Sequence, residues 1–257
     1  MEPSNKGVSR RQLLRGAAAA GGGLALAGIA TAQADDMQMV AEPMRLRALT
    51  RSEAAIAGAM ADRVFPRDGS SPSATEIGFV EYLDGQLAGG WGSGERFYRQ
   101  GPFVEPETSG HGYQLSLTPR EVYRRVLPEI DAYARRRHGG RSFTELSDAQ
   151  QDAVMTAVQD GRVDLGLAHS ENGFTSASFF SMFLQNVNEG LFADPVYGGN
   201  RGRAGWRWID YPGDPMAYGD YYFTIFGHQD DAYEIEPQSI ADTARSPYMN
   251  MSSTRRG

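Results

Sequence analysis

The sequence predicts a mainly α-helical domain, irregular in outline, with long loops rich in glycine, proline and aromatic residues. Three observations lead to this prediction. Apolar residues recur at helical spacing in several segments. Capping boxes, in which a hydroxyl residue is followed three positions later by Glu or Gln, precede such segments at Thr50 with Glu53 and at Ser147 with Gln150. The chain also shows no internal repeat and no alternation of strand and helix patterns, so a parallel sheet is not expected.

The first 34 residues have the pattern of a twin-arginine signal peptide, which exports proteins to the periplasm. Arg10 and Arg11 are adjacent, a charge-free run rich in Ala and Gly begins at Gly16, and residues 32–34 read Ala-Gln-Ala, a small-residue cleavage site. An uncleaved membrane anchor is the alternative, because the charge-free run is nearly long enough to cross a bilayer. Its Ala and Gly content makes transfer into lipid weakly favourable, so we predict a cleaved signal.

Beyond the signal we expect a flexible linker over residues 35–49 and a single domain over residues 50–257. The first helix should begin at the capping box of Thr50 and stop before Pro66. A second helix is expected over about residues 73–87, ended by the glycines of residues 89–94. In both helices, the apolar residues expected to face the core recur at helical spacing. They are Ile56, Met60 and Val64 in the first helix, and Ile77, Val80, Leu83 and Leu87 in the second. Residues 91–117, rich in Gly and Pro, should be irregular.

Three further helices are expected. Thr118 caps one of them, with Pro119 at its first position and Glu121 three residues after the cap, and Pro128 should kink it. Another runs from the capping box of Ser147 to Gly161. The last, over about residues 175–192, is apolar around much of its circumference, so we expect it to be central and buried. The end of the chain is expected to form an extended tail.

The run over residues 189–214, EGLFADPVYGGNRGRAGWRWIDYPGD, is the least generic part of the chain. Its prolines remove backbone donors and its glycines permit unusual backbone angles, so we predict a long structured loop. Aromatic residues and arginines are interleaved in it, a composition typical of contact surfaces between proteins. The alternative is a loop folded over the core of its own domain.

The same residues resemble a known family. FADPVYGGNR at residues 192–201, AGW at 204–206 and YPG at 211–213 resemble the gluconate 2-dehydrogenase subunit 3 family, and the resemblance covers about residues 50–213. Members of that family are small, non-catalytic subunits of membrane-associated, FAD-dependent sugar and polyol dehydrogenases. The signature residues, which we predict to hold the large subunit, are Phe192, Asp194, Tyr197, Asn200, Arg201, Trp206, Trp208 and Tyr211.

The resemblance implies a set of partners. FAD is expected in a large subunit of the GMC type, which performs the oxidation. A membrane-bound cytochrome c subunit, carrying haem c, is the expected electron acceptor. The large subunits of this family have no signal of their own, so Arg10 and Arg11 would address the whole complex to the Tat translocase and the periplasm.

Composition excludes several kinds of site. The chain has no Cys, which excludes disulfides, thiolate metal sites and covalent haem attachment. Lys6 is the only lysine, so the exported chain holds no GK[ST] phosphate loop and no Schiff-base lysine. No GxGxxG or GxSxG motif occurs, and a net charge of −7 does not favour nucleic acid. We therefore predict no catalytic, cofactor-binding or metal-binding residue in this chain.

Two alternatives to an accessory subunit remain open. An enzyme acting alone would have to assemble its site from scattered carboxylates and the four histidines. A carbohydrate-binding protein would use Trp206, Trp208 and Tyr211 as a stacking platform, since alternate positions of an extended segment place Trp206 and Trp208 on one face.

Overall fold

The computed structural model describes residues 45–69, 71–97, 99–103, 115–167, 174–211, 213 and 237–243. The chain divides into two units, Met1–Arg45 and Leu46–Gly257, and every helix below belongs to the second. The predicted export signal, with Arg10 and Arg11, residues 35–44 of the linker and most of the C-terminal tail lie outside the described residues.

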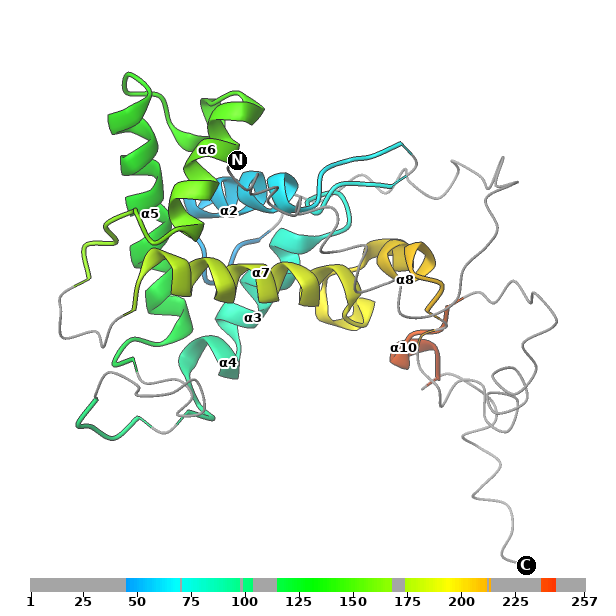
Figure 1. Cartoon of the computed structure of the whole chain (residues 1–257). Helices are drawn as coiled ribbons and strands as arrows, with labels where there is room; N and C mark the ends of the chain where they lie inside the picture. Colours follow the sequence, from blue (N-terminus) through cyan, green and yellow to red (C-terminus); the bar gives the residue numbers. More distant parts are fainter. Residues whose placement is uncertain are drawn as a thin grey trace, which may run out of the picture. The chain divides into compact units, whose positions relative to one another are not determined.

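The mainly helical prediction is confirmed, because helices are the only extended regular elements in the described part of the chain (Figure 1). The α-helices are α2 (Arg51–Val64), α3 (Phe79–Ala88), α4 (Gly90–Ser93), α5 (Pro119–Arg137), α6 (Asp148–Gln159), α7 (Ser176–Phe192), α8 (Ala204–Trp208) and α10 (Ile240–Thr243). In the same described residues, three 3-10 turns accompany them: η3 (Phe143–Glu145), η5 (Pro195–Tyr197) and η6 (Arg201–Arg203). None of the described helices is both long enough and apolar enough to span a membrane.

Polar caps begin the long helices where the sequence predicts them. Thr50, Thr118, Ser147 and Thr175 are the N-caps of α2, α5, α6 and α7, and each takes part in a reciprocal capping box. The box satisfies two backbone donors that a helix start otherwise leaves without partners. α5 continues through Pro128 without interruption.

The second helix begins later than predicted. α3 starts at Phe79, not near Ser73, because the preceding residue Gly78 has a left-handed backbone (φ 93°) that a continuous α-helix does not allow. The turn before it is held to α2 by Asp62, whose carboxylate accepts hydrogen bonds from the Thr75 amide (2.9 Å) and hydroxyl (2.8 Å). A short helix, α4, also occupies part of the stretch that we expected to be irregular.

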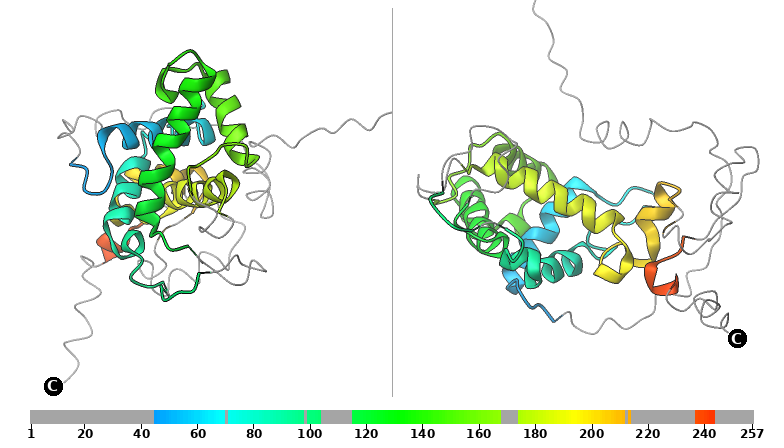
Figure 2. Two further views of the ribbon diagram at one scale, coloured as in Figure 1. Left: turned by 90° about the vertical axis from the view of Figure 1, so that its left-hand side faces the viewer. Right: turned by 90° about the horizontal axis from the view of Figure 1, so that it is seen from below.

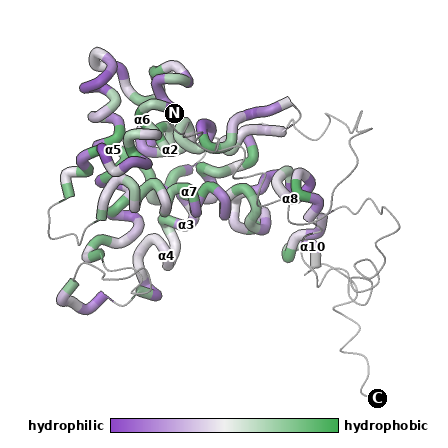
Figure 3. Tube along the Cα trace, in the orientation of Figure 1, coloured by the Kyte–Doolittle hydropathy of each residue, from purple (hydrophilic) through white to green (hydrophobic). Residues whose placement is uncertain are grey.

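α7 is the centre of the hydrophobic core, as its apolar sequence predicts. It contacts α2, α3, α6 and α8, and it crosses the middle of the helices in Figure 1. Phe179 and Phe183 are fully buried in an aromatic row that includes Tyr123 of α5 and Phe79 of α3, with ring centroids 5.2–6.1 Å apart. Figure 3 shows hydrophobic residues along α2 and α7 and hydrophilic ones at the turn that joins α5 and α6.

A buried carboxylate fixes the segment that leads into α2. Asp84 of α3 accepts hydrogen bonds from the backbone amides of Arg47, Ala48 and Leu49, each 2.9 Å long. Three amide donors compensate the loss of water around a buried carboxylate. Figure 2 shows α5 and α6 near one end of α7, while α8 and α10 lie near the other end, where the run over residues 189–214 begins.

Candidate functional site

Residues 193–213, which we call the signature loop, follow directly after α7. The predicted long loop is structured, but it is not free of regular elements, since it contains η5, η6 and α8. Asp194 is the N-cap of η5, where its carboxylate accepts the Val196 amide at 2.9 Å, and Pro195 occupies the first position. Short polar caps of this kind let a loop hold backbone turns that are too brief to be stable alone.

Glycines let the signature loop pack its backbone directly on the end of α7. A Cβ at Gly199 would lie 2.3 Å from the carbonyl oxygen of Gly190, and a Cβ at Gly205 would lie 1.9 Å from that of Leu191. Both distances are far inside van der Waals contact, so no side chain fits at either position. The glycines of the YGGNR and AGW motifs therefore have a structural explanation.

Asn200 joins two parts of the loop to the end of α7 from a fully buried position. Its backbone amide donates to the Gly190 carbonyl (2.9 Å). Its side chain donates to the Ala193 carbonyl (3.0 Å) and accepts from the Gly205 backbone amide (2.9 Å). Its backbone is left-handed, with φ 46°, a conformation that Asn tolerates better than most residues. Asn200 therefore organises the loop from within.

The two tryptophans of α8 have different surroundings. Trp206 is only 3% exposed, and its ring nitrogen donates to the Phe192 carbonyl at 2.7 Å. Trp208 is 44% exposed and packs edge-on against Phe65 and nearly parallel to Phe192, with centroids 5.2 and 6.2 Å away. Tyr211 contacts the Trp206 ring.

The helical path of α8 overturns the geometry expected for a sugar platform. Side chains two residues apart in an α-helix are separated by a rotation of about 200° around the helix axis. Trp206 and Trp208 therefore lie on opposite faces of α8. Of the two tryptophans, only Trp208 is exposed to solvent. The prediction of a shared stacking face is therefore wrong, because it assumed an extended segment.

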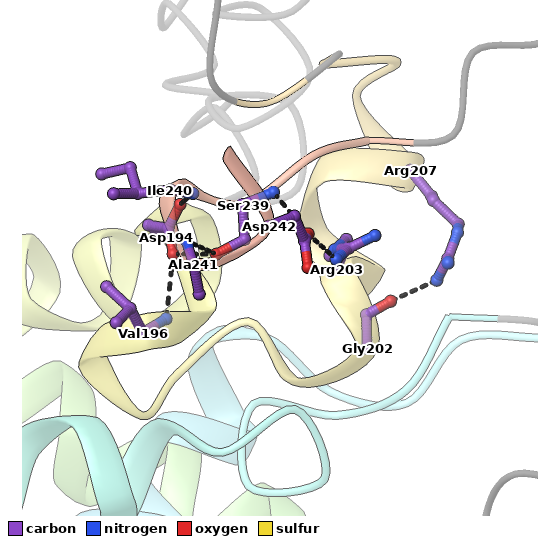
Figure 4. A network of polar contacts seen from close by, with 9 residues as sticks. All are labelled: Asp194, Val196, Gly202, Arg203, Arg207, Ser239, Ile240, Ala241 and Asp242. Atoms are coloured by element: carbon purple, nitrogen blue, oxygen red, sulfur yellow. Dashed lines mark hydrogen bonds and ion pairs between the residues drawn. The ribbon is translucent and has the colours of Figure 1, made fainter. Parts of the chain in front are cut away.

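A segment from the predicted tail docks on the signature loop (Figure 4). The Asp194 carboxylate accepts hydrogen bonds from the Ser239 hydroxyl (2.7 Å) and the Ile240 amide (2.8 Å), and Arg203 forms an ion pair with Asp242. The sequence does not predict this contact, and Ile240–Thr243 is a helical turn where we expected an extended chain. Asp194 therefore has two structural roles, one in its own turn and one in holding residues 237–243.

The large hydrophobic residues that stay exposed gather in this region. Across the described ranges, all of them belong to the signature loop or the docked segment, with 41–55% of their surface exposed. We call this set the outward face; it consists of Val196, Tyr197, Trp208, Ile209, Tyr211 and Ile240. Val196 and Ile240 are neighbours, since both amides bind the Asp194 carboxylate.

The eight signature residues predicted to bind a partner divide into two groups. Tyr197, Trp208 and Tyr211 are exposed, as is Arg201, which forms a 2.8 Å ion pair with Glu81 of α3. The inner group consists of Asp194, Asn200 and Trp206, which are buried, and Phe192, which is partly buried. The exposure of Val196, Ile209 and Ile240 was not predicted from the sequence. For Val196 and Ile209, an apolar residue placed between turn residues could have indicated it.

Metal ligands do not converge in the described ranges: no three His, Cys, Asp or Glu side chains there are placed to hold an ion.

A family model described as gluconate 2-dehydrogenase subunit 3 matches residues 51–213. No curated protein and no solved structure matches the chain significantly. The matched span runs from the first residue of α2 to the end of the signature loop, and stops before the docked segment. Because it covers more than half of the chain and includes both the helical core and the signature loop, the chain belongs to the gluconate 2-dehydrogenase subunit 3 family.

Proposed function

We propose that this chain is the non-catalytic accessory subunit of a periplasmic, FAD-dependent dehydrogenase that oxidises sugars, polyols or sugar acids. Its role is to bind and stabilise the large subunit and to carry it through the Tat translocase. Membership of a family of dehydrogenase subunits supports an accessory role. The further steps rest on the surface of the signature loop and on the sequence of the N-terminus.

The outward face is the observation that carries the proposal. Scattered exposed hydrophobic residues are normal on a soluble protein, but a concentration of them in one region is typical of an interaction site. Tyr197, Trp208 and Tyr211 are also of the residue types that interfaces favour, because their rings bury a large area at low cost in conformational entropy. The large subunit is the partner that would cover this face.

The buried signature residues support the exposed ones. Asn200 and Trp206 hold the loop backbone, and Asp194 holds the docked segment, so the exposed rings project from a fixed frame. A fixed frame lowers the entropy lost on binding. Truncating the inner residues should therefore weaken a complex indirectly, whereas truncating the outward face should weaken it directly.

The proposal also assigns the cofactors to the partner subunits and the export signal to this chain. The large subunit, of the GMC type, holds FAD and performs the oxidation, and a membrane-bound cytochrome c subunit with haem c receives the electrons. Arg10 and Arg11 supply the export signal for the complex, which folds and binds its flavin before it crosses the membrane.

The proposal is tested by purification from the native host. The full chain with a C-terminal affinity tag is isolated from periplasm and membrane, and its visible absorption spectrum and gel pattern are recorded. We expect a yellow preparation with a larger flavin-containing band whose flavin absorption is bleached by a sugar or polyol. A colourless preparation with a single band would contradict the proposal.

Export is tested separately with the double variant Arg10→Lys/Arg11→Lys. It should leave both this chain and the dehydrogenase activity in the cytoplasm. Arg15→Lys is the matched control, because it makes the same change in the same segment outside the arginine pair. Dehydrogenase activity that still reaches the periplasm in the double variant would show that the chain is not the carrier.

A further inference from the structure

A groove opens beside the signature loop, between α3 and the C-terminal end of α7. Its volume is about 580 Å³, within the range of roughly 300–1,000 Å³ that holds small ligands or inserted side chains. Tyr82 and Gln86 of α3 line one side, Asn188, Glu189 and Phe192 of α7 line the other, and Tyr197 of the signature loop borders it. Its walls therefore combine aromatic rings with a single carboxylate.

Neutral donors hold the Glu189 carboxylate in place. It accepts hydrogen bonds from the Tyr82 hydroxyl (3.0 Å) and from the side-chain amides of Asn186 (3.2 Å) and Gln185 (2.9 Å). Asn186 is fixed in turn by the buried Tyr123 hydroxyl, which donates to it at 2.7 Å. The carboxylate is thus oriented by a network that reaches into the core.

The hydroxyl groups of Tyr82 and Tyr123 keep their protons in this network. Burial raises the pKa of the Tyr82 hydroxyl well above its usual value, and the negative charge of Glu189 raises it further. Burial likewise raises the pKa of Tyr123. Both hydroxyls therefore remain donors at physiological pH, Tyr82 to the Glu189 carboxylate and Tyr123 to the Asn186 side chain.

Glu189 and Glu81, an acid on α3, differ in the charge of their partners. Glu81 is paired with Arg201 at 2.8 Å, whereas no ion pair to Glu189 forms among the described residues. A carboxylate held by neutral groups beside aromatic rings is complementary to an incoming cation. Of the two basic side chains, arginine matches best, because its planar fork binds a carboxylate and its face stacks on rings.

We propose that this groove receives an arginine side chain of the dehydrogenase large subunit, with Glu189 as its ion-pair partner and Phe192 and Tyr197 as its aromatic walls. The inference rests on the proposed function and deepens it. It extends the interface from the signature loop onto α3 and α7, and it adds Glu189, Tyr82, Gln86 and Asn188 to the residues predicted from sequence.

Glu189→Gln is the primary test, because it keeps the size of the side chain and one acceptor oxygen while removing the charge. The purified full-length chain and the flavoprotein subunit are titrated at low and high salt. The variant should bind at least about tenfold more weakly, with a shallower salt dependence than the wild type. Glu129→Gln is the matched control: Glu129 is also partly exposed but lies on α5, outside the groove, and its replacement should leave affinity unchanged.

A crosslink identifies the occupant. The chain has no Cys, so Asn188→Cys places one reactive thiol on the groove wall. Labelled with a photoreactive maleimide, it should crosslink to a large-subunit peptide that contains an arginine. Replacing that arginine with Gln should weaken the wild-type complex but add little to the effect of Glu189→Gln, as expected for a coupled pair. Tyr133→Cys, on α5, is the control and should give no such crosslink.

The possible failures are distinct. If the flavoprotein does not bind the wild-type chain, the proposed function is wrong. If it binds the wild type and a folded Glu189→Gln variant equally well, or if the crosslinked peptide holds no arginine, only the groove assignment is wrong. Far-UV circular dichroism establishes that the variant is folded.

Discussion

The helical core and the signature loop are stabilised by opposite means. The core buries large side chains, such as Phe179 and Phe183 of α7, in a continuous apolar interior. The loop buries backbone, through Gly199 and Gly205, and the side chains of Asp194, Asn200 and Trp206, while most of its large apolar side chains face outward. The core is thus built for stability, whereas the loop uses polar contacts and glycines to present aromatic residues to solvent.

This contrast separates the residues that the path of the loop requires from those that it does not require. Glycines at contact points and an Asn in a left-handed conformation cannot be exchanged freely, because the loop path depends on them. Among the outward residues, Trp208 and Tyr211 still pack on rings of the domain, whereas Val196 and Tyr197 are more than half exposed. Their apolar character therefore points to a partner, and the variants below separate the two kinds of residue.

The largest expected effect is in the core. Phe183→Ala removes a fully buried ring that contacts Phe79 and Phe179, so the free energy of unfolding should fall by about 3–5 kcal/mol. Chemical denaturation followed by circular dichroism measures the change. A loss below about 1 kcal/mol would show that α7 is not the centre of the core.

The next largest loss of stability is expected when two glycines of the loop are compared by substitution with Ala. Gly205→Ala forces a Cβ to within 1.9 Å of the Leu191 carbonyl oxygen, and it should cost about 3 kcal/mol. Gly202→Ala meets no atom within 4 Å, but it has a left-handed backbone (φ 61°), so it should cost only about 1 kcal/mol. Equal losses in the two variants, measured by the same denaturation, would contradict close backbone packing as the basis of the loop.

The smallest effect concerns a helix cap. Hydrogen bonds from the Thr118 backbone, and then from its hydroxyl, lower the pKa of Glu121 below its usual value of 4.5. A lowered pKa in the folded state means stabilisation that is present above about pH 5 and is lost as the pH falls through the folded value. Glu121→Gln should therefore cost less than about 1 kcal/mol at pH 7, since the side chain is exposed, and less still near pH 3. A difference that does not change with pH would contradict this role of the carboxylate.

Local sequence signals predicted most of the helical core. Capping residues and apolar spacing are short-range features, so the starts of α2, α5, α6 and α7 could be located to within a residue. The start of α3 could not, because Gly78 takes a left-handed backbone where it approaches the Gly198 carbonyl, a contact that depends on the fold. The same limit applies to Asp84, whose hydrogen bonds reach back more than 30 residues.

The candidate site was less predictable. The aromatic and glycine content identified the right stretch, but not which residues face outward, because helical turns in the loop reverse the sides expected from an extended chain. Docking of Ser239 and Ile240 on Asp194 joins residues 45 or more apart in sequence and has no local signal. The Glu189 groove depends on the approach of α3 to α7, and so it too required the structure.

The central claim, that the outward face binds the dehydrogenase large subunit, is tested most directly with Val196→Ser/Tyr197→Ser. These are the two most exposed members of the face, so the free energy of unfolding should change by less than about 0.5 kcal/mol. Affinity for the flavoprotein subunit should fall by at least about tenfold. Tyr133→Ser, on α5, should leave affinity unchanged. A double variant that keeps both wild-type stability and wild-type affinity would contradict the claim.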